Sequence, residues 1–404
     1  MNTGAVEYRE GISMEKYNAQ IVARKILESI QEARKNMTML NVMVLGKTGA
    51  GKSTLINNVF NEQLAETGIG KPVTDKIRAY GKEGFALTIY DTPGLELGGE
   101  NALGELLKEV SAVIEKGIKS GKIEEAIHCI WYCVNTNTHR FEEAEKAFIS
   151  RFLDETQKYN VPVILVLTQS ISKQDARELK SEIEKENLAL AQIVPVLAQD
   201  YEIDGDYTVK AYGLDLLIEI MNNVIPETVK NTLIAVQKAN IEMKRQRAHA
   251  IVAGSAATAA ATGAVPIPFA DAALLVPEQI AMLAGITVTF GIPVEKATLT
   301  AIISATLGTT GATALGRTAV GSILKMIPGA GSVAGGAISA GVAAAITAAL
   351  GEAYIAVMTM VAKGEMQMSD IDTREGKKTI KKLFKERLKL KRNEEGVAEE
   401  ESEP

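Results

Sequence analysis

Reactive and metal-binding side chains are scarce in this sequence of 404 residues. It has two cysteines, three histidines and one tryptophan, and aromatic residues make up 5% of it. Cys129 and Cys133 lie in a predicted strand that holds their α-carbons roughly 13 Å apart, too far for a disulfide. No histidine has the spacing of a zinc ligand, so we expect no structural zinc site. We interpret both cysteines as small buried residues of a reduced, intracellular protein.

An excess of positive charge and a secretory signal are also missing. The formal net charge is -6, so we expect no nucleic acid partner on electrostatic grounds. Residues 1–36 are polar and charged, without the apolar segment of a signal peptide. Within them, Ile21, Val22, Ile26 and Ile30 recur at helical spacing and predict an amphipathic helix over 13–36.

The chain is too long for one ordinary core, which predicts two domains or more. Between 40 and about 225, continuous apolar runs alternate with helical stretches, a pattern typical of a mostly parallel, doubly wound α/β sheet. The predicted strands are 40–46, 85–91, 126–134, 161–168 and 192–199, with 75–83 as a possible extra edge strand. The predicted helices are 52–62, 101–119, 141–157, 173–189 and 213–224.

A phosphate-binding motif joins the first predicted strand to the first helix. Residues 46–53 are GKTGAGKS, which matches G-x-x-x-x-G-K-[S/T]. Its glycines let backbone N–H groups converge on one point, and the helix N-terminus adds positive potential there. We expect Lys52 to reach the β- and γ-phosphates and Ser53 to ligate Mg²⁺. The predicted nucleotide-binding residues here are Gly46, Lys47, Thr48, Gly49, Ala50, Gly51, Lys52, Ser53 and Thr54.

A second motif, DTPG at 91–94, follows the apolar segment 85–90. On its own it would be an ordinary turn, but at a strand end it places Asp91 to hold Mg²⁺, directly or through water. The Gly94 amide is then placed to sense the γ-phosphate. Between the motifs, Thr74 is the preferred switch residue, able to close over Mg²⁺ and the γ-phosphate, with Thr67 as the competitor.

Together, GKTGAGKS, GKPVT and DTPG resemble the Era-type and septin-like GTPases of the translation-factor class, over about residues 40–225. The resemblance implies a P-loop NTPase G domain that binds GTP and GDP with Mg²⁺. It implies phosphate and magnesium roles for five residues, with Ser53, Thr74 and Asp91 at the metal and Lys52, Thr74 and Gly94 in catalysis.

The motif that normally selects guanine, [N/T]-K-x-D, is broken at the end of the fifth strand. Thr168 fits it, but Gln169 replaces the lysine and Ile171 stands in the place of the aspartate. Asp175 is nearby, displaced by four residues. Ala198, in the segment after the last strand, is expected to supply a backbone contact. GTP remains the expected ligand, with a P-loop ATPase as one alternative.

Features that speed hydrolysis are missing as well. Leu95 follows Gly94 where a water-orienting glutamine could stand, and Gly49 occupies the place of the asparagine in potassium-using Era-type loops. We therefore predict a slow GTPase switch. Septin-like relatives commonly pair nucleotide sites face to face, so a homodimer is possible through 135–143, with His139 and Arg140; the other interpretation of that segment is a solvated loop.

Charges become rare from 248 to 361, where Ala, Gly and Thr dominate. The region predicts three or four closely packed helices and resembles the YcjF-like domain of unknown function that follows some bacterial G domains. Uncharged runs of bilayer length and the basic segment 377–392 suggest membrane association; a soluble bundle is the other interpretation. A nucleotide-dependent membrane scaffold or assembly protein with negligible hydrolysis is the first alternative function, ahead of the ATPase. The cytoplasm or the cytoplasmic face of the inner membrane is the expected location.

We therefore expect four parts in the chain. They are an N-terminal amphipathic helix (1–37), a G domain (38–226), a hydrophobic helical domain (227–362), and a basic helix with an acidic disordered tail (363–404).

Overall fold

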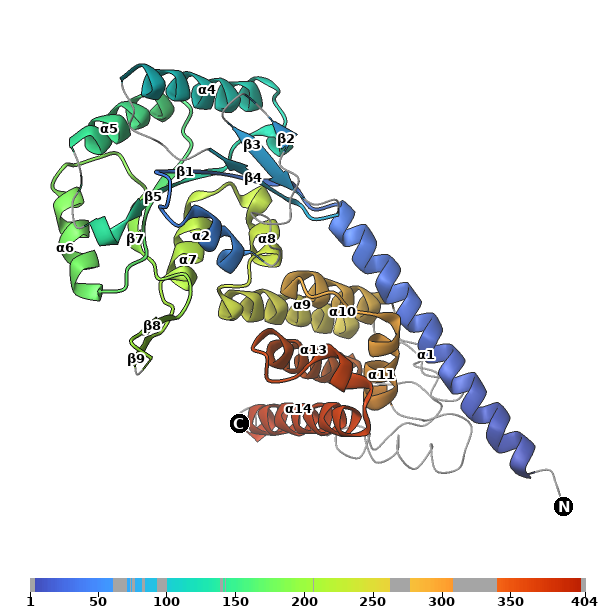
Figure 1. Ribbon diagram of the computed structural model, residues 1–404. Helices are drawn as coiled ribbons and strands as arrows, with labels where there is room; N and C mark the ends of the chain where they lie inside the picture. Colours follow the sequence, from blue (N-terminus) through green and yellow to red (C-terminus); the bar gives the residue numbers. More distant parts are fainter. Residues whose placement is uncertain are drawn as a thin grey trace. The chain divides into compact units, whose positions relative to one another are not determined.

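A computed structural model describes residues 4–60, 71–72, 74, 77–81, 84–92, 100–138, 141, 143–205, 207–261, 277–307 and 340–400. The chain forms two compact units (Figure 1). One unit is Asn36–Asn240, and the other combines Met1–Lys35 with Ile241–Pro404. The division after Asn240 leaves α8 (Glu227–Val236) with the sheet, whereas the sequence pattern placed the change of domain at 226.

The first unit is built on a sheet with the order β2-β3-β4-β1-β5-β6-β7, counting the strands that the structure describes. The run from β4 to β7 is parallel, and β2 and β3 are antiparallel to their neighbours. The predicted α/β sheet is therefore confirmed. The strands are β1 Leu40–Gly46, β2 Lys71–Pro72, β3 Arg78–Gly81, β4 Leu87–Asp91, β5 Cys129–Asn135, β6 Val163–Thr168 and β7 Gln192–Pro195.

The expected edge strand over 75–83 corresponds to β3, but β3 is not at the edge. The two-residue strand β2 pairs outside it, with Lys71 opposite Ala79. A strand of two residues that includes Pro72 has no apolar pattern of its own, so sequence analysis did not predict it.

Helices cover both faces of the sheet, as Figure 1 shows. One face packs against α4 (Glu100–Lys119), α5 (Glu143–Gln157) and α6 (Lys173–Glu184) in a single apolar core. The other faces α2 (Lys52–Val59), α7 (Leu214–Val224) and α8. On that side the ring of Trp131 in β5 stacks on Phe60, with 5.6 Å between centroids. Because β1 is buried on both faces, its sequence is a continuous apolar run rather than an alternating one.

The carboxyl ends of the parallel strands meet at one edge of the sheet. In the strand register, Val44 of β1 lies beside Asp91 of β4, and Gly46 lies beside Cys133 of β5. A Cβ atom on Gly46 would come 2.5 Å from the Cys133 carbonyl oxygen, so only glycine allows this approach. In the sheet, β1 lies between β4 and β5: the strands that follow β1 directly, β2 to β4, lie on one side of it, and the chain then crosses to β5 on the other side. Ligands of open α/β sheets bind at such a switch point.

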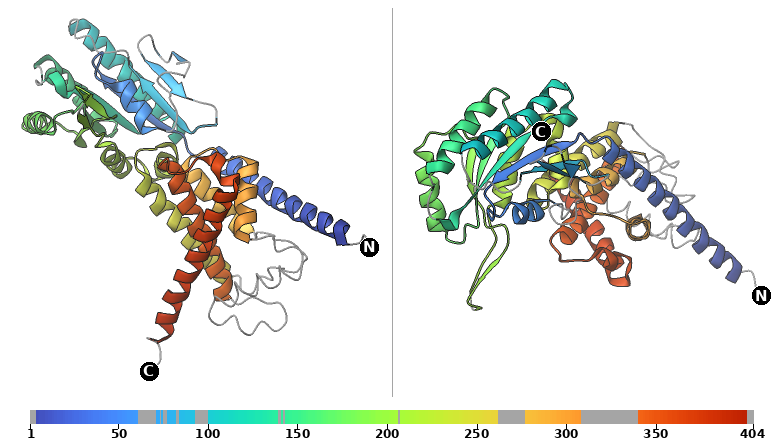
Figure 2. Two further views of the ribbon diagram at one scale, coloured as in Figure 1. Left: turned by 60° about the horizontal axis from the view of Figure 1, so that its bottom comes forward. Right: turned by 45° about the horizontal axis from the view of Figure 1, so that its top comes forward.

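A two-stranded hairpin between β7 and α7 extends away from the sheet in both figures (Figures 1 and 2). Its strands are β8 (Tyr201–Ile203) and β9 (Tyr207–Val209), paired antiparallel with Tyr201 opposite Val209. Tyr201, Ile203 and Tyr207 are exposed. The sequence analysis did not foresee this hairpin, because its strands are only three residues long.

The second unit is helical. Its apolar core joins α1 to the helices that follow residue 240, with Val22, Ile26 and Ile30 of α1 buried in it. The predicted helical C-terminal region is confirmed. The described elements are α1 Gly4–Lys35, α9 Ile241–Ala261, α10 Pro277–Phe290, α11 Lys296–Leu307, α13 Ala340–Ala362, the 3-10 turn Met368–Asp372 and α14 Arg374–Glu400.

Two features of the helical unit bear on the sequence-based expectations. Helix α14 continues to Glu400, so the acidic segment expected to be disordered is helical up to that residue, since Glu and Ala are strong helix formers.

In the described part of the chain, one helical stretch, Ala343–Ala362, is long and apolar enough to span a membrane. Because 67% of its most apolar part is buried inside the protein, packing in the core of the helical unit accounts for its composition equally well.

Candidate functional site: the nucleotide-binding edge of the sheet

The loop Gly46–Ser53 leaves β1 and leads directly into α2. Gly49 and Gly51 have φ angles of 75° and 76°, in the left-handed region that side chains disfavour. Gly51 precedes the first helical residue, Lys52, and no described side chain caps that end of α2. The first N–H groups of the helix are thus available to an anion, which the helix dipole also attracts.

Lys52 folds back over this loop. Its Nζ donates hydrogen bonds to the carbonyl oxygens of Gly46 (2.9 Å) and Lys47 (3.2 Å), and the Ala50 N–H closes the loop onto the Lys47 carbonyl at 3.1 Å. The ammonium group therefore lies against the first two carbonyl groups of the loop. The loop itself carries two lysines and no carboxylate.

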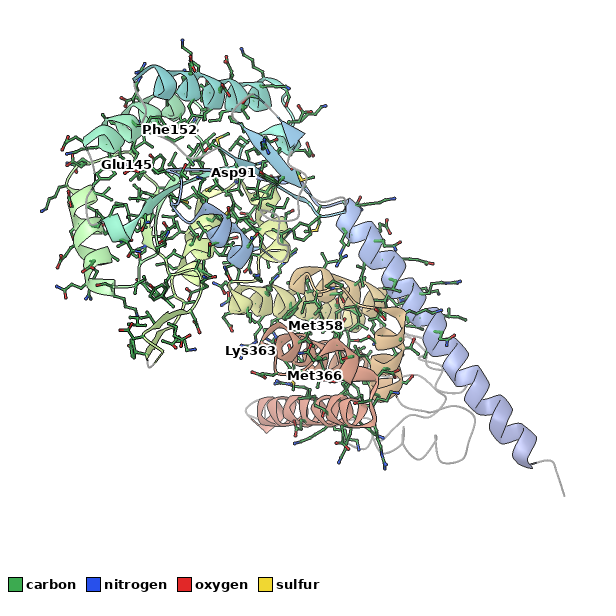
Figure 3. All side chains as sticks on the ribbon, in the orientation of Figure 1. Asp91, Glu145, Phe152, Met358, Lys363 and Met366 are labelled. Atoms are coloured by element: carbon green, nitrogen blue, oxygen red, sulfur yellow. The ribbon has the colours of Figure 1, made fainter. Side chains whose placement is uncertain are left out.

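Asp91 ends β4 beside the loop, and Figure 3 labels it in the sheet unit. Its Oδ1 atom is buried and has no hydrogen-bond partner among the described residues. Burial raises the pKa of this carboxyl, while the nearby Lys52 ammonium and the Thr92 backbone hydrogen bond lower it. An unpartnered carboxylate oxygen at the end of β4 and the exposed Ser53 hydroxyl at the start of α2 are oxygen donors of the kind that Mg²⁺ prefers.

Thr74 lies in a different setting from the one the sequence suggested. Its hydroxyl donates a hydrogen bond to the carboxylate of Glu109 in α4 and accepts one from the Ile77 N–H at 3.0 Å. Several other predicted or competing residues lie outside the described residues: Thr67, Gly94, Leu95, His139 and Arg140.

Two side chains at the end of β6 form hydrogen bonds with the phosphate loop. The Thr168 hydroxyl lies 2.6 Å from the Ala50 carbonyl oxygen and 3.1 Å from that of Val134. The next side chain, Gln169, donates from Nε2 to the Gly49 carbonyl at 2.9 Å. Both residues were predicted to contact the nucleotide; in this structure their side chains contact the loop that would hold its phosphates.

Ala198 lies in the segment that follows β7, beside the turn after β6. The two segments are joined by the Ser170 N–H, which donates to the Val196 carbonyl at 3.1 Å. Tyr212 adds a second link, because its hydroxyl donates to the Ser170 carbonyl at 2.8 Å and its backbone pairs with Leu197. Sequence analysis missed Tyr212, which no motif marks.

An ion pair ties the phosphate loop to α5. Lys47 Nζ lies 3.0 Å from Glu145 Oε2, and the Glu145 side chain is only 4% exposed. Figure 3 labels Glu145 in the sheet unit. Sequence analysis did not predict this pair, because a glutamate in the first turn of a helix is usually explained by its favourable interaction with the helix dipole.

Comparison with known proteins places two families on the chain. Residues 41–169 match the family described as 50S ribosome-binding GTPase, and residues 229–392 match a domain of unknown function, DUF697. Residues 41–169 are therefore similar to a GTPase domain and residues 229–392 to a DUF697 domain. These are the two regions for which the sequence indicated a G domain followed by a domain of unknown function.

Individual relatives are distant and cover part of the chain. GTPase Era of Pseudomonas fluorescens is 28% identical over 191 residues, covering 46% of this chain and 55% of its own. Neuronal-specific septin-3 of Mus musculus is 24% identical over 196 residues, covering 42% and 55%. The chain thus spans about half the length of these curated relatives.

Two solved structures show a weak overall likeness. One comes from a study of dimerisation and GTPase activity in the chloroplast translocon components atToc33 and psToc159. It is 19% identical, covers 54% of this chain and 94% of that chain, and has a TM-score of 0.31. The other, the bacterial selenocysteine-specific elongation factor EF-Sec, is 18% identical and covers 46% and 29%, with a TM-score of 0.28.

Proposed function

We propose that this chain is a magnesium-dependent GTPase that acts as a slow nucleotide switch. The observation that carries the proposal is the uncapped start of α2 beside Lys52 and the buried, unpartnered oxygen of Asp91. Converging amides and an ammonium group suit the phosphates, and the carboxylate suits the cation that accompanies them. The match of residues 41–169 to a GTPase family supports the same activity.

In this proposal the roles of the chain's own groups are distinct. The amides of Gly46–Ser53 and Lys52 bind and orient the phosphates, and Ser53 and Asp91 hold the cation. When bound, Mg²⁺ neutralises charge that develops on the transferred phosphoryl group. Since Lys52 now bonds to Gly46 and Lys47 carbonyls, phosphate binding would exchange those contacts for stronger charge-assisted ones.

The switch in this proposal is Thr74. Its hydroxyl now bonds to Glu109 in α4, so closure over the γ-phosphate would break that bond and release α4 from the segment around Thr74. The slow rate rests on the sequence, because Leu95 stands after Gly94 and cannot orient a water. Acceleration in a homodimer through 135–143 is part of the same proposal.

Membrane association of the second unit is a further part of the proposal, with 248–361 and 377–392 as the contacting regions. The apolar face of α14 is not free to insert into a bilayer, because Ile380, Phe384 and Leu388 are buried in the unit's own core. The exposed lysines of α14 favour electrostatic contact with anionic lipid headgroups rather than insertion of that helix.

The test is Mg²⁺-dependent GTP binding and phosphate release by the full chain, the Lys52→Ala variant and a Lys158→Ala control. Lys158 is an exposed lysine of the same unit, paired with Glu155. The proposal expects Lys52→Ala to lose both activities and the control to keep them. GTP binding with equal, residual phosphate release from all three would favour the scaffold alternative, and displacement of GTP by equimolar ATP would favour an ATPase.

A further inference from the structure

The turn after β6 has an aliphatic residue where a guanine-selective site needs an acceptor. Guanine presents two adjacent donors, N1–H and the 2-amino group, and one carboxylate can accept from both. Hypoxanthine keeps N1–H and the 6-keto oxygen but lacks the 2-amino group. A comparison of GTP with ITP therefore isolates the contribution of an acceptor for that group.

The structure decides which residue of the turn takes the acceptor's place. The sequence left Ile171 and Asp175 as alternatives. Thr168 and Gln169 are fixed to the phosphate loop through the carbonyls of Ala50 and Gly49. With these two positions fixed, Ile171 occupies the position two residues beyond Gln169, in the turn that leads away from the loop.

Asp175 belongs to a different element. It lies in the first turn of α6, where its N–H donates to the Ser172 hydroxyl at 3.2 Å and its carboxylate complements the helix dipole. It follows Ile171 by four residues, about one helical turn. The geometry thus assigns Asp175 to the capped start of α6 rather than to the base.

The remaining polar groups of the turn are engaged within the protein. The Ser170 hydroxyl is buried, lies 2.9 Å from that of Thr136 and donates to the Leu167 carbonyl at 2.8 Å. The Ser170 carbonyl accepts from Tyr212, and the Ser172 hydroxyl accepts from Asp175. Between residues 170 and 172, no side-chain carboxylate is present to accept from a purine.

The neighbouring segment offers a donor instead. Ala198 is half-buried beside this turn, and in the described part of the chain its N–H makes no hydrogen bond. Such an amide can donate to the 6-keto oxygen, which GTP and ITP share and ATP lacks. The part of the site that faces the base therefore has a donor for the 6-keto oxygen. Position 171 has no acceptor for the 2-amino group.

We propose that the site selects 6-oxopurine nucleotides without reading the 2-amino group, so that GTP and ITP bind alike. This inference rests on the proposed nucleotide-binding function. It names position 171 as the residue that sets the difference, because a carboxylate there would restore an acceptor for both donors.

Competition of GTP, ITP and ATP against one fluorescent GTP analogue, with Mg²⁺ and the full chain, tests the inference. We expect the GTP and ITP affinities to agree within about threefold, and Ile171→Asp to raise the preference for GTP to about tenfold or more, the effect of a hydrogen bond to a charged group. Asp175→Asn is the matched control and should leave the ratio unchanged.

Two outcomes would overturn the inference. One is a native preference for GTP over ITP above about tenfold, and its collapse in Asp175→Asn would then identify Asp175 as the acceptor. The other is a folded Ile171→Asp variant with an unchanged ratio of GTP to ITP affinity. The native ratio needs no variant and remains decisive if a variant does not fold. Failure of every nucleotide to bind would instead refute the proposed function, so the two failures are distinguishable.

Discussion

The phosphate end and the base end of the proposed site lie on the same edge of the sheet but are built differently. The phosphate end uses the backbone of one segment, Gly46–Ser53, and its chemistry is visible as a sequence motif. The base end combines two segments, after β6 and after β7, joined by Ser170 and Tyr212. In a site made from one contiguous loop, each residue must allow the backbone conformation that the loop needs. In a site assembled from two segments, side chains can change while the hydrogen bonds between the segments keep the shape.

Replacing Asp91 with asparagine should have the largest effect on this comparison, because it acts at the phosphate end alone. The variant keeps the shape and loses the charge, so Mg²⁺-dependent GTP affinity should fall by about 10- to 100-fold. Binding measured in EDTA should change little. Asp154→Asn, on the exposed side of α5, is the control.

The same residue predicts a pH dependence. Because burial raises the pKa of Asp91, protons compete with Mg²⁺ at higher pH than at an ordinary aspartate. The Mg²⁺ affinity of the native chain should therefore fall as the pH decreases through that raised pKa, and Asp91→Asn should remove this fall. A native affinity that is flat from neutral to acidic pH would contradict the role of Asp91.

The Lys47–Glu145 ion pair allows the phosphate end to be tested through protein stability rather than through ligand binding. Lys47→Met leaves the Glu145 carboxylate buried without this cation and should lower the free energy of unfolding of the sheet unit by about 2 kcal/mol. Adding Glu145→Gln should recover part of the loss. Lys158→Met breaks the exposed pair with Glu155 and should cost under about 0.5 kcal/mol.

Chemical denaturation of the full chain, followed by the fluorescence of the only tryptophan, Trp131 in β5, measures these changes. If Lys47→Met proved as mild as Lys158→Met, the pair would not hold the loop.

The smallest expected effect tests whether the base end supports the phosphate end. Gln169→Ala removes the hydrogen bond to the Gly49 carbonyl, worth about 1 kcal/mol, and should weaken GTP and ITP binding equally, by about fivefold. Gln174→Ala, which removes an exposed contact with Glu178 in α6, is the control. A loss confined to GTP would show that Gln169 reads the base instead.

Much of this arrangement could be predicted from the sequence, because its causes are local. Buried strands give continuous apolar runs, and the phosphate loop needs glycines and a lysine at fixed spacing, so β1, Lys52 and the strand-end position of Asp91 were predictable. Contacts between distant segments were not. The Thr74–Glu109 bond, the Lys47–Glu145 pair and the link from Gln169 to Gly49 each join residues at least 35 positions apart, and nothing near either partner marks them.

The measurement that tests the central claim most directly compares the equilibrium affinities of the full chain for GTP, GDP and GMP in the presence of Mg²⁺. If the phosphate end carries the binding, GTP and GDP should bind well and GMP, which lacks the phosphates held by the loop and Lys52, should bind at least about 100-fold more weakly, a difference of about 2.7 kcal/mol. If GMP bound as tightly as GTP, the binding would come from the base and ribose, and the assignment of Gly46–Ser53 as the phosphate site would be contradicted.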